Sequence, residues 1–417
     1  MAVPRSPALA PFRIRSFRYQ WPADLTTSWA LEMEMLILGW YVLVETRSVL
    51  MLTIFASLQY IGTLLSPMFG VMGDRVGHRH VLCAMRALYA ALASLLMIFA
   101  FMDALTPMIV LAISAVLGLV RPSDIGMRTA MVGETMPPEQ LMAAMGIQRT
   151  TQDSARIAGA LTGTGLVATL GMGPAYAVVV TFYVISVLLT LKAGRVTLAQ
   201  PAPESTTQRP TPWRDLREGL SYVWHMPHLR AIMLFAFLLN LTAFPLFNSL
   251  MPYVAKVVYE ADQTTLGTMV AAAATGSLTG SIIMSRFGGL FSPARAMLVF
   301  GAAWLGVLLV FAQTTSPAAG IPVLVLAGIM QTMGLIPIST LLLRTSDPRY
   351  RGRVMGIRMM AIYGNLPGLM LAGPLITAFG YAATATAYSL FGIAVIALIA
   401  LLWREHLWQG GAAANAR

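Results

Sequence analysis

Twelve long apolar runs, separated by polar segments, constrain this chain more than any other feature of its sequence. A helix needs about 20 mainly apolar residues to cross a bilayer, and each run is about that long or longer. We therefore predict an all-α membrane protein with twelve transmembrane helices, at about 22–44, 48–72, 80–101, 107–131, 141–169, 173–193, 229–255, 263–285, 294–313, 320–343, 354–379 and 381–403.

The composition agrees with a chain that lies mostly in lipid. Hydrophobic residues make up 57% of the chain and charged residues only 11%, whereas soluble domains are about 25% charged. The net charge of +11 does not indicate a nucleic-acid partner, because the basic residues lie in short clusters between the apolar runs. The single cysteine, Cys83, leaves no internal disulfide and no cysteine metal cluster.

The distribution of basic residues predicts the orientation of the chain. If the N-terminus is cytoplasmic, only Arg47 and Lys256 of the 28 lysines and arginines fall in or beside the opposite loops. Basic residues concentrate in cytoplasmic loops. We therefore expect both termini in the cytoplasm.

The two halves of the chain repeat. At a fixed offset of 210 residues, identical residues pair as Met145 with Met355, Gly146 with Gly356, Ile147 with Ile357, and Gly163 with Gly373. Transporters are commonly built from such repeats. We expect six-helix bundles at 21–194 and 229–404, a basic N-terminal segment at 1–20, a cytoplasmic linker at 195–228 and a cytoplasmic tail at 405–417.

The linker begins with the Pro/Ser/Thr/Gln-rich stretch "QPAPESTTQRPTP" and continues with residues at helical spacing. Thr211 suits an N-cap and Pro212 a first helical residue. After them, apolar side chains recur at Trp213, Leu216, Leu220 and Trp224. This pattern predicts an amphipathic helix on the membrane surface; a solvated linker helix is the alternative.

The segment between the second and third runs reads "GVMGDRVGHR" and contains Gly70, Gly73, Asp74, Arg75, Gly77 and Arg79. Gly73 and Gly77 can adopt a positive φ, which a tight link between antiparallel helices needs. With six plus six spans, the pattern Gly-x-x-x-Asp-Arg-x-Gly-x-Arg resembles the signature of the major facilitator superfamily. "LGWYVLVETRS" and "DPRYRGRVMGI" are similar to its bacterial export branch, which includes enterobactin-exporter-like proteins.

The resemblance implies a gate at this motif. In the family, Asp74 would latch onto the start of the eleventh span, with Arg128 as a nearby cation, and a carboxylate at a helix N-terminus is stabilising by about 0.3–1 kcal/mol. The alternative is that these charges only set topology. Two positions depart from the family pattern. His78 replaces a base, and Gly159-Ala160 replaces Gly-Pro, which puts drug/proton antiport in question.

Two charge ladders mark the fourth and fifth runs. Arg121, Asp124 and Arg128 share one helix face, as do Arg149, Asp153 and Arg156. The runs are antiparallel neighbours, so we expect the ladders to interdigitate as a cytoplasmic charge network. Such a network is either a structural set of salt bridges or a moving gate.

Candidate binding residues lie deeper in the spans. Glu32 and Glu34 are two residues apart, so they lie about 200° apart around the helix and cannot both face one cavity. We favour Glu34, which aligns with a position often polar in the resembling branch, as a site for a cation or a coupling proton. The alternative is a hydrogen bond to a neighbouring helix. Further candidates, which could instead join helices, are Gln59, Asn240, Gln331 and Asn365.

Together these features predict a secondary active transporter of the bacterial inner membrane. We expect it to export a small amphipathic, drug-like or siderophore-like molecule by alternating access, as an antiporter that a proton gradient can drive. We predict no catalytic residue, metal or cofactor, and a monomer in the lipid bilayer. The alternatives are a sensor or assembly factor that keeps the fold without transport, and an importer or lipid flippase.

Overall fold

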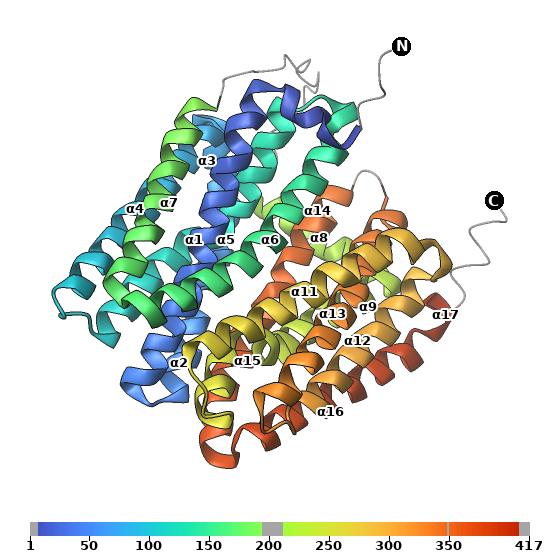
Figure 1. Cartoon of the computed structure of the whole chain (residues 1–417). Coiled ribbons are helices and arrows are strands. Elements are labelled where there is room, and N and C mark those ends of the chain that lie inside the picture. Colours follow the sequence, from blue (N-terminus) through green and yellow to red (C-terminus); the bar gives the residue numbers. More distant parts are fainter. Residues whose placement is uncertain (1–6, 194–211, 348–349, 408–417) are drawn as a thin grey trace, which may run out of the picture. The chain divides into compact units, whose positions relative to one another are not determined.

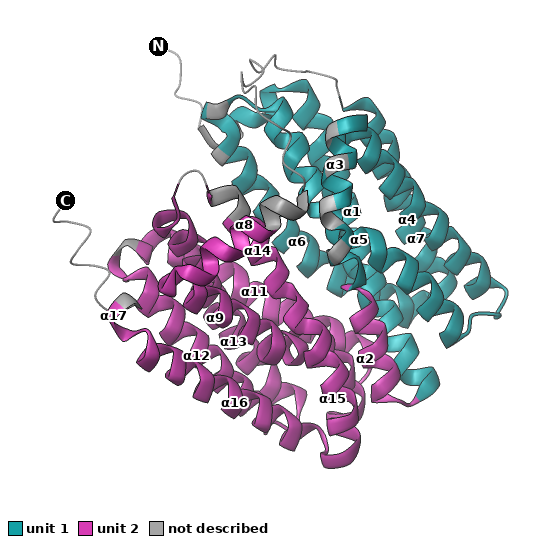
Figure 2. Cartoon of the chain, turned by 180° about the vertical axis from the view of Figure 1, so that it is seen from behind, with its two compact units in different colours: residues 1–46, 61–207 teal, residues 47–60, 208–417 magenta. Residues whose placement is uncertain are grey.

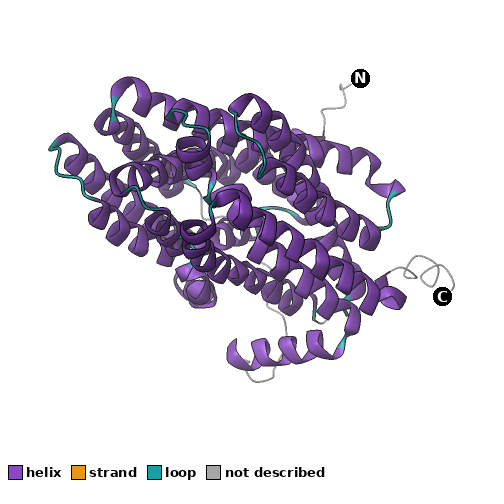
Figure 3. Ribbon diagram, turned by 90° about the horizontal axis from the view of Figure 1, so that it is seen from below, coloured by secondary structure: helices purple, strands orange, loops and turns teal. Residues whose placement is uncertain are grey.

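The computed structural model describes residues 7–193, 212–347 and 350–407, and those residues contain helices and no strand (Figures 1 and 3). All twelve apolar runs lie in helical segments, which confirms the all-α class. Ten stretches among the described residues are long and apolar enough to cross a membrane. The other two are the shorter apolar stretch Val49–Thr63 and the helix Pro138–Leu170, which carries charged residues.

The chain forms two compact units, residues 1–46 with 61–207 and residues 47–60 with 208–417 (Figure 2). The elements of unit 1 are η1 (Pro7–Arg13), α1 (Arg15–Thr46), η2 (Ile61–Leu65), α3 (Ser66–Val76), α4 (His78–Phe101), α5 (Pro107–Thr135), α6 (Pro138–Leu170) and α7 (Met172–Lys192).

Helix α1 is central to unit 1 because it packs against α5, α6 and α7. Two glycines four residues apart on α6 allow its close approach. A Cβ added at Gly159 would lie 2.7 Å from the Cβ of Glu32, and one added at Gly163 would lie 3.0 Å from the Cα of Met33. Because Gly159 and Gly163 have no side chain, the backbones of α6 and α1 can pack closely, as is common between membrane helices.

The glycine motif joins α3 to α4. Gly77 ends α3 with a φ of 96°, so its predicted positive φ is confirmed. The same expectation for Gly73 is wrong, because Gly73 lies within α3. Gly73 is needed for another reason: a Cβ there would lie 2.7 Å from Cδ2 of the His78 ring.

The elements of unit 2 include one from the N-terminal half of the chain. They are α2 (Val49–Leu58), α8 (Pro212–His225), α9 (Pro227–Phe244), η3 (Pro245–Ser249), α10 (Met251–Tyr253), η4 (Val254–Val258), α11 (Gln263–Phe287), η5 (Gly288–Leu290), α12 (Pro293–Phe311), α13 (Pro317–Thr345), α14 (Arg351–Met360), η6 (Ala361–Gly364), α15 (Asn365–Phe379), α16 (Tyr381–Leu402) and α17 (Arg404–Leu407).

The second predicted span is not one helix. Its first part, α2, packs against α15 in unit 2, whereas η2 and α3 belong to unit 1. The helix ends because the N–H groups of Gln59 and Tyr60 bond three residues back, to Ala56 and Ser57, and so tighten the last turn. The continuous helix expected over 48–72 is therefore wrong.

Two other spans are interrupted. The run at 229–255 continues from α9 into the wider π turns η3 and η4, and η3 begins at Pro245. Proline lacks the N–H that would bond four residues back, so it loosens the helix at that point. The run at 354–379 is divided into α14 and α15 by the 3₁₀ segment η6.

The linker helix α8 begins at Pro212, as predicted. It packs against α9 and α14, and the Tyr222 ring stacks on the Tyr350 ring with 4.4 Å between centroids. The Tyr222 hydroxyl also accepts a hydrogen bond from the Asp347 N–H at 3.1 Å. Thr211 and the side chains of Trp213 and Leu216 lie outside the described residues.

Helices α11 and α13 approach each other closely in unit 2. A Cβ added at Gly276 would lie 2.0 Å from the carbonyl oxygen of Val325, and one added at Gly328 would lie 2.2 Å from that of Ala273. Gly276 and Gly280 are spaced as in the GxxxG motif of membrane helix pairs.

We predict that Gly276→Ala destabilises the protein by about 1–3 kcal/mol through overpacking. The matched control is Gly306→Ala in α12, where an added Cβ meets nothing within 4 Å; it should be neutral or stabilise by up to about 1 kcal/mol. Thermal melts of both detergent-purified variants measure the difference, and equal melting temperatures would contradict the close α11–α13 approach.

Candidate functional site

Four charged side chains meet inside unit 1. Asp24 comes from α1, Arg86 from α4, and Asp124 and Arg128 from α5, and each side chain is at most 4% exposed. Arg86 forms an ion pair with Asp24. Arg128 Nη2 lies 2.5 Å from Asp124 Oδ2, and Arg128 Nε lies 3.8 Å from Asp24 Oδ1. The two positive and two negative charges of this buried charge cluster balance.

Uncharged groups complete the buried charge cluster. Gln148 of α6 donates from Nε2 to Asp24 Oδ2 at 3.3 Å. Arg128 Nη1 donates to the Ser28 hydroxyl at 2.6 Å, and Arg86 donates to the Thr190 hydroxyl of α7. The cluster therefore joins α1, α4, α5, α6 and α7. Pairing of this kind offsets the desolvation of charges at membrane depth.

Two of the four cluster residues, Asp124 and Arg128, were predicted as members of a charge network; Asp24 and Arg86 were not. The signal was present, because each missed residue is a charge inside a predicted span and buried charges are expected to find partners. What the sequence lacked was the helix order around α1, which decides which charges can meet.

The second predicted ladder lies on α6. Its Arg149 Nε is 3.3 Å from Asp153 Oδ2, and the Arg149 side chain is 68% exposed. Arg121 and Arg156 also have interaction partners. The expected interdigitation of the two ladders stays a prediction, since the ion pairs described above form within α5, within α6, or with α1 and α4.

Glu34 is buried in α1 and points to α7. Its Oε2 accepts a hydrogen bond from the Tyr183 hydroxyl at 2.9 Å, and its Oε1 has no hydrogen-bond partner among the described residues. The Tyr176 hydroxyl is likewise buried and unbonded within the described part of the chain. Glu32 is half-buried beside Gly159 of α6. The two side chains therefore leave α1 toward different helices.

The candidate amides lie between helices of unit 2. Asn365 Nδ2 donates to Asn240 Oδ1 at 2.9 Å, which joins α15 to α9. Gln331 Oε1 accepts from the Ser277 hydroxyl at 3.1 Å, which joins α13 to α11. Gln59 is buried at the end of α2. These contacts support the helix-joining alternative, and a role in substrate binding stays a prediction.

The motif residues have separate surroundings. Arg79 donates to the carbonyl oxygens of Thr190 and Leu191 at the C-terminal end of α7, where a cation is favourable. His78 Nδ1 lies 2.7 Å from Glu134 Oε1 on α5. Arg75 is exposed, and Gly70 is half-buried with open space beside it. The Asp74 side chain lies outside the described residues, so its latch stays a prediction.

Long apolar helices that bury paired charges define a multi-pass membrane protein. Residues 26–363 and 233–413 match the sequence profile of the Major Facilitator Superfamily. The chain belongs to this superfamily of transporters, which confirms the resemblance and the twelve-helix fold class. A small-molecule substrate and a bilayer follow from that membership.

One curated relative is the multidrug efflux pump Tap of Mycolicibacterium fortuitum, 30% identical over 197 residues. The match spans 45% of this chain and 46% of the pump, less than half of either length. Similar solved structures include a mutant of the nucleoside transporter NupG, with a TM-score of 0.71 and 13% identity over 92% of this chain and 99% of that one. Another is the human organic anion transporter MFSD10, with a TM-score of 0.66 and 16% identity over 93% and 99%. At these identities the structures show the fold alone.

We predict that Asp24→Asn destabilises the protein by about 3–5 kcal/mol, because it leaves the Arg86 charge buried without its partner. Adding Arg86→Gln to Asp24→Asn should restore part of the loss. Arg149→Gln is the control, since an exposed pair contributes about 0–1 kcal/mol. Thermal melts of the purified variants measure these differences in stability. An Asp24→Asn melting temperature equal to that of the control would contradict the cluster's structural role.

Proposed function

We propose that the protein is a proton-coupled antiporter that exports a small amphipathic, drug-like molecule by alternating access. The observation that carries the proposal is the environment of Glu34, a buried carboxyl group in a transmembrane helix. The partial similarity to the multidrug efflux pump Tap supports export. The distribution of lysine and arginine supports cytoplasmic termini, and we place the protein in the bacterial inner membrane.

Glu34 has neighbours suited to both of its protonation states. The Tyr183 hydroxyl donates to Oε2, and a hydrogen bond of this kind stabilises the charged form. In the neutral form, a proton on the unbonded Oε1 would be a donor. The Tyr176 hydroxyl lies two turns before Tyr183 on α7 and has no hydrogen bond within the described residues, so it is the candidate acceptor.

Such a site can couple a proton to a conformational change. A buried carboxyl group that gains or loses a proton changes the charge inside unit 1 by one unit, which is a large perturbation in a low-dielectric interior. A ligand or ion shifts a conformational equilibrium only through its different affinity for the two states. The proposed coupling therefore requires that Glu34 bind its proton with different affinity in the two states.

We predict that Glu34→Gln abolishes transport driven by a pH gradient while downhill substrate exchange continues, because glutamine cannot exchange a proton. The measurement is substrate flux into proteoliposomes with and without a pH gradient. The substrate is first found by a thermal-shift screen, since a ligand of the folded form raises its melting temperature.

The control for this test is Glu32→Gln on the other face of α1, which should keep the response to the gradient. If Glu34→Gln retains a normal pH dependence, Glu34 is not the coupling site. If well-folded wild-type protein gives no flux with any ligand that binds, the sensor or assembly-factor alternative is favoured.

We also predict that Asp74→Asn reduces turnover at least several-fold while membrane insertion stays normal. The asparagine lacks the negative charge that is expected to bind the start of the eleventh span in one of the two conformations. Initial rates in proteoliposomes at matched protein density measure this effect. Wild-type turnover by the folded variant would remove the gating role. Arg18→Gln, which changes an exposed arginine of α1 outside the motif, is the control and should keep wild-type turnover.

A further inference from the structure

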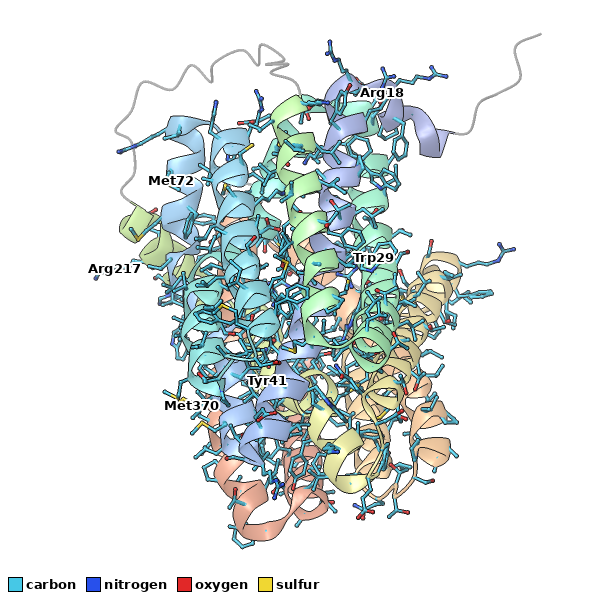
Figure 4. All side chains as sticks on the ribbon, turned by 60° about the vertical axis from the view of Figure 1, so that its left-hand side comes forward. Arg18, Trp29, Tyr41, Met72, Arg217 and Met370 are labelled. Atoms are coloured by element: carbon cyan, nitrogen blue, oxygen red, sulfur yellow. The ribbon has the colours of Figure 1, made fainter. Side chains whose placement is uncertain are left out.

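The outer face of α8 exposes two large apolar side chains, Leu220 and Trp224, beside the polar Ser221 and His225. Arg217, Leu220 and Trp224 share this face by their three- and four-residue spacing, and Leu220 and Trp224 are 49% and 61% exposed. Arg217 points away from α8 in Figure 4 and is also exposed. The opposite face, which includes Gly219 and Val223, is buried.

Arg230, near the start of α9, lies between two indole rings. Its guanidinium carbon is 5.7 Å from the ring centroid of Trp224 on α8 and 5.5 Å from that of Trp403 after α16. These cation–π contacts orient the guanidinium. Arg230 Nε is buried and has no hydrogen-bond partner among the described residues.

Arg230 thus lies beside the exposed Trp224. Arg230 is near the start of α9 and Trp403 directly follows α16, and both helices are long and apolar enough to cross a membrane (Figure 1). Tryptophan is enriched at the level of lipid headgroups. Arginine presents several N–H donors in one plane, a geometry that matches phosphate oxygens. Arg217 and Arg404 add exposed positive charge, and Glu405 is an exposed acidic group beside Arg404.

We propose that Trp224, Arg230 and Trp403 form a binding site for the phosphate headgroup of an anionic phospholipid, with an acyl chain of that lipid covering Leu220 and Trp224. Basic pockets between transmembrane helices are a recurring form of lipid recognition. The exposed Leu220 and Trp224 favour a lipid over a soluble phosphate compound, because a lipid can cover these two apolar side chains and also supply the anion. This site rests on membership of a membrane-protein family and is independent of the proposed transport reaction.

The test uses the full-length chain, delipidated in detergent and titrated with phosphatidylglycerol or with phosphatidylcholine of the same acyl chains. Native mass spectrometry measures the fraction of protein that carries lipid. Wild type should bind phosphatidylglycerol more tightly than phosphatidylcholine. Arg230→Gln should weaken phosphatidylglycerol binding about fivefold, the effect expected for one basic side chain near an anionic surface, and leave phosphatidylcholine binding unchanged.

Three further variants separate the site from general charge effects and from misfolding. Arg230→Lys keeps the charge but loses the planar donors, so it should retain only part of the preference. Trp224→Ala changes an exposed side chain, so the fold is preserved and phosphatidylglycerol binding should still weaken. Arg286→Gln removes an exposed arginine at the end of α11 and should bind as wild type does.

The proposal is overturned if folded Arg230→Gln and Trp224→Ala both bind phosphatidylglycerol as tightly as wild type. It is also overturned if Arg286→Gln weakens binding as much as Arg230→Gln, because the preference would then depend on overall charge. The last measurement adds soluble glycerophosphoglycerol, the headgroup without acyl chains, as a competitor of phosphatidylglycerol. Competition as strong as that of the lipid would make this an anion site without lipid recognition, and weak competition supports the proposal.

Discussion

A charged side chain inside a bilayer must find an opposite charge or lose its own, and this constraint organises unit 1. Asp24, Arg86, Asp124 and Arg128 balance one another between α1, α4 and α5. An unpaired charge at that depth would oppose folding by several kcal/mol. The cluster therefore fixes how these helices sit around α1, and in doing so it holds α1 and its Glu34 against α7.

The closest helix contacts in both units depend on small residues. Lipid tails are as apolar as leucine, so burial from water cannot drive helix association inside the membrane. Gly159 and Gly163 bring α6 against α1, and Gly276, Gly280 and Gly328 bring α11 against α13. The close α11–α13 contact leaves Gln331 of α13 within hydrogen-bonding distance of Ser277 of α11.

Much of the fold could be predicted from the sequence, because apolar run length and breaker residues are local properties. All twelve runs are helical, and α8 begins at Pro212 as predicted. The change of helix type at Pro245 coincides with a local breaker residue, but the break after Leu58 could not be predicted in this way. The break after Leu58 separates α2, which packs on α15 in unit 2, from the rest of its span, and this pairing is a long-range property. The candidate site was only partly predictable for the same reason. Spacing placed Asp124 and Arg128 on one face, but it could not bring Asp24 and Arg86 to them from other helices.

The central claim is that Glu34 exchanges a proton in step with substrate binding. The most direct measurement is the proton released when a transported compound binds to the detergent-purified protein in weakly buffered solution, followed with a pH indicator. We expect wild type to release a proton on binding and Glu34→Gln to bind the compound without release. Equal release by both proteins, or none by wild type at any pH at which the compound binds, would contradict the account.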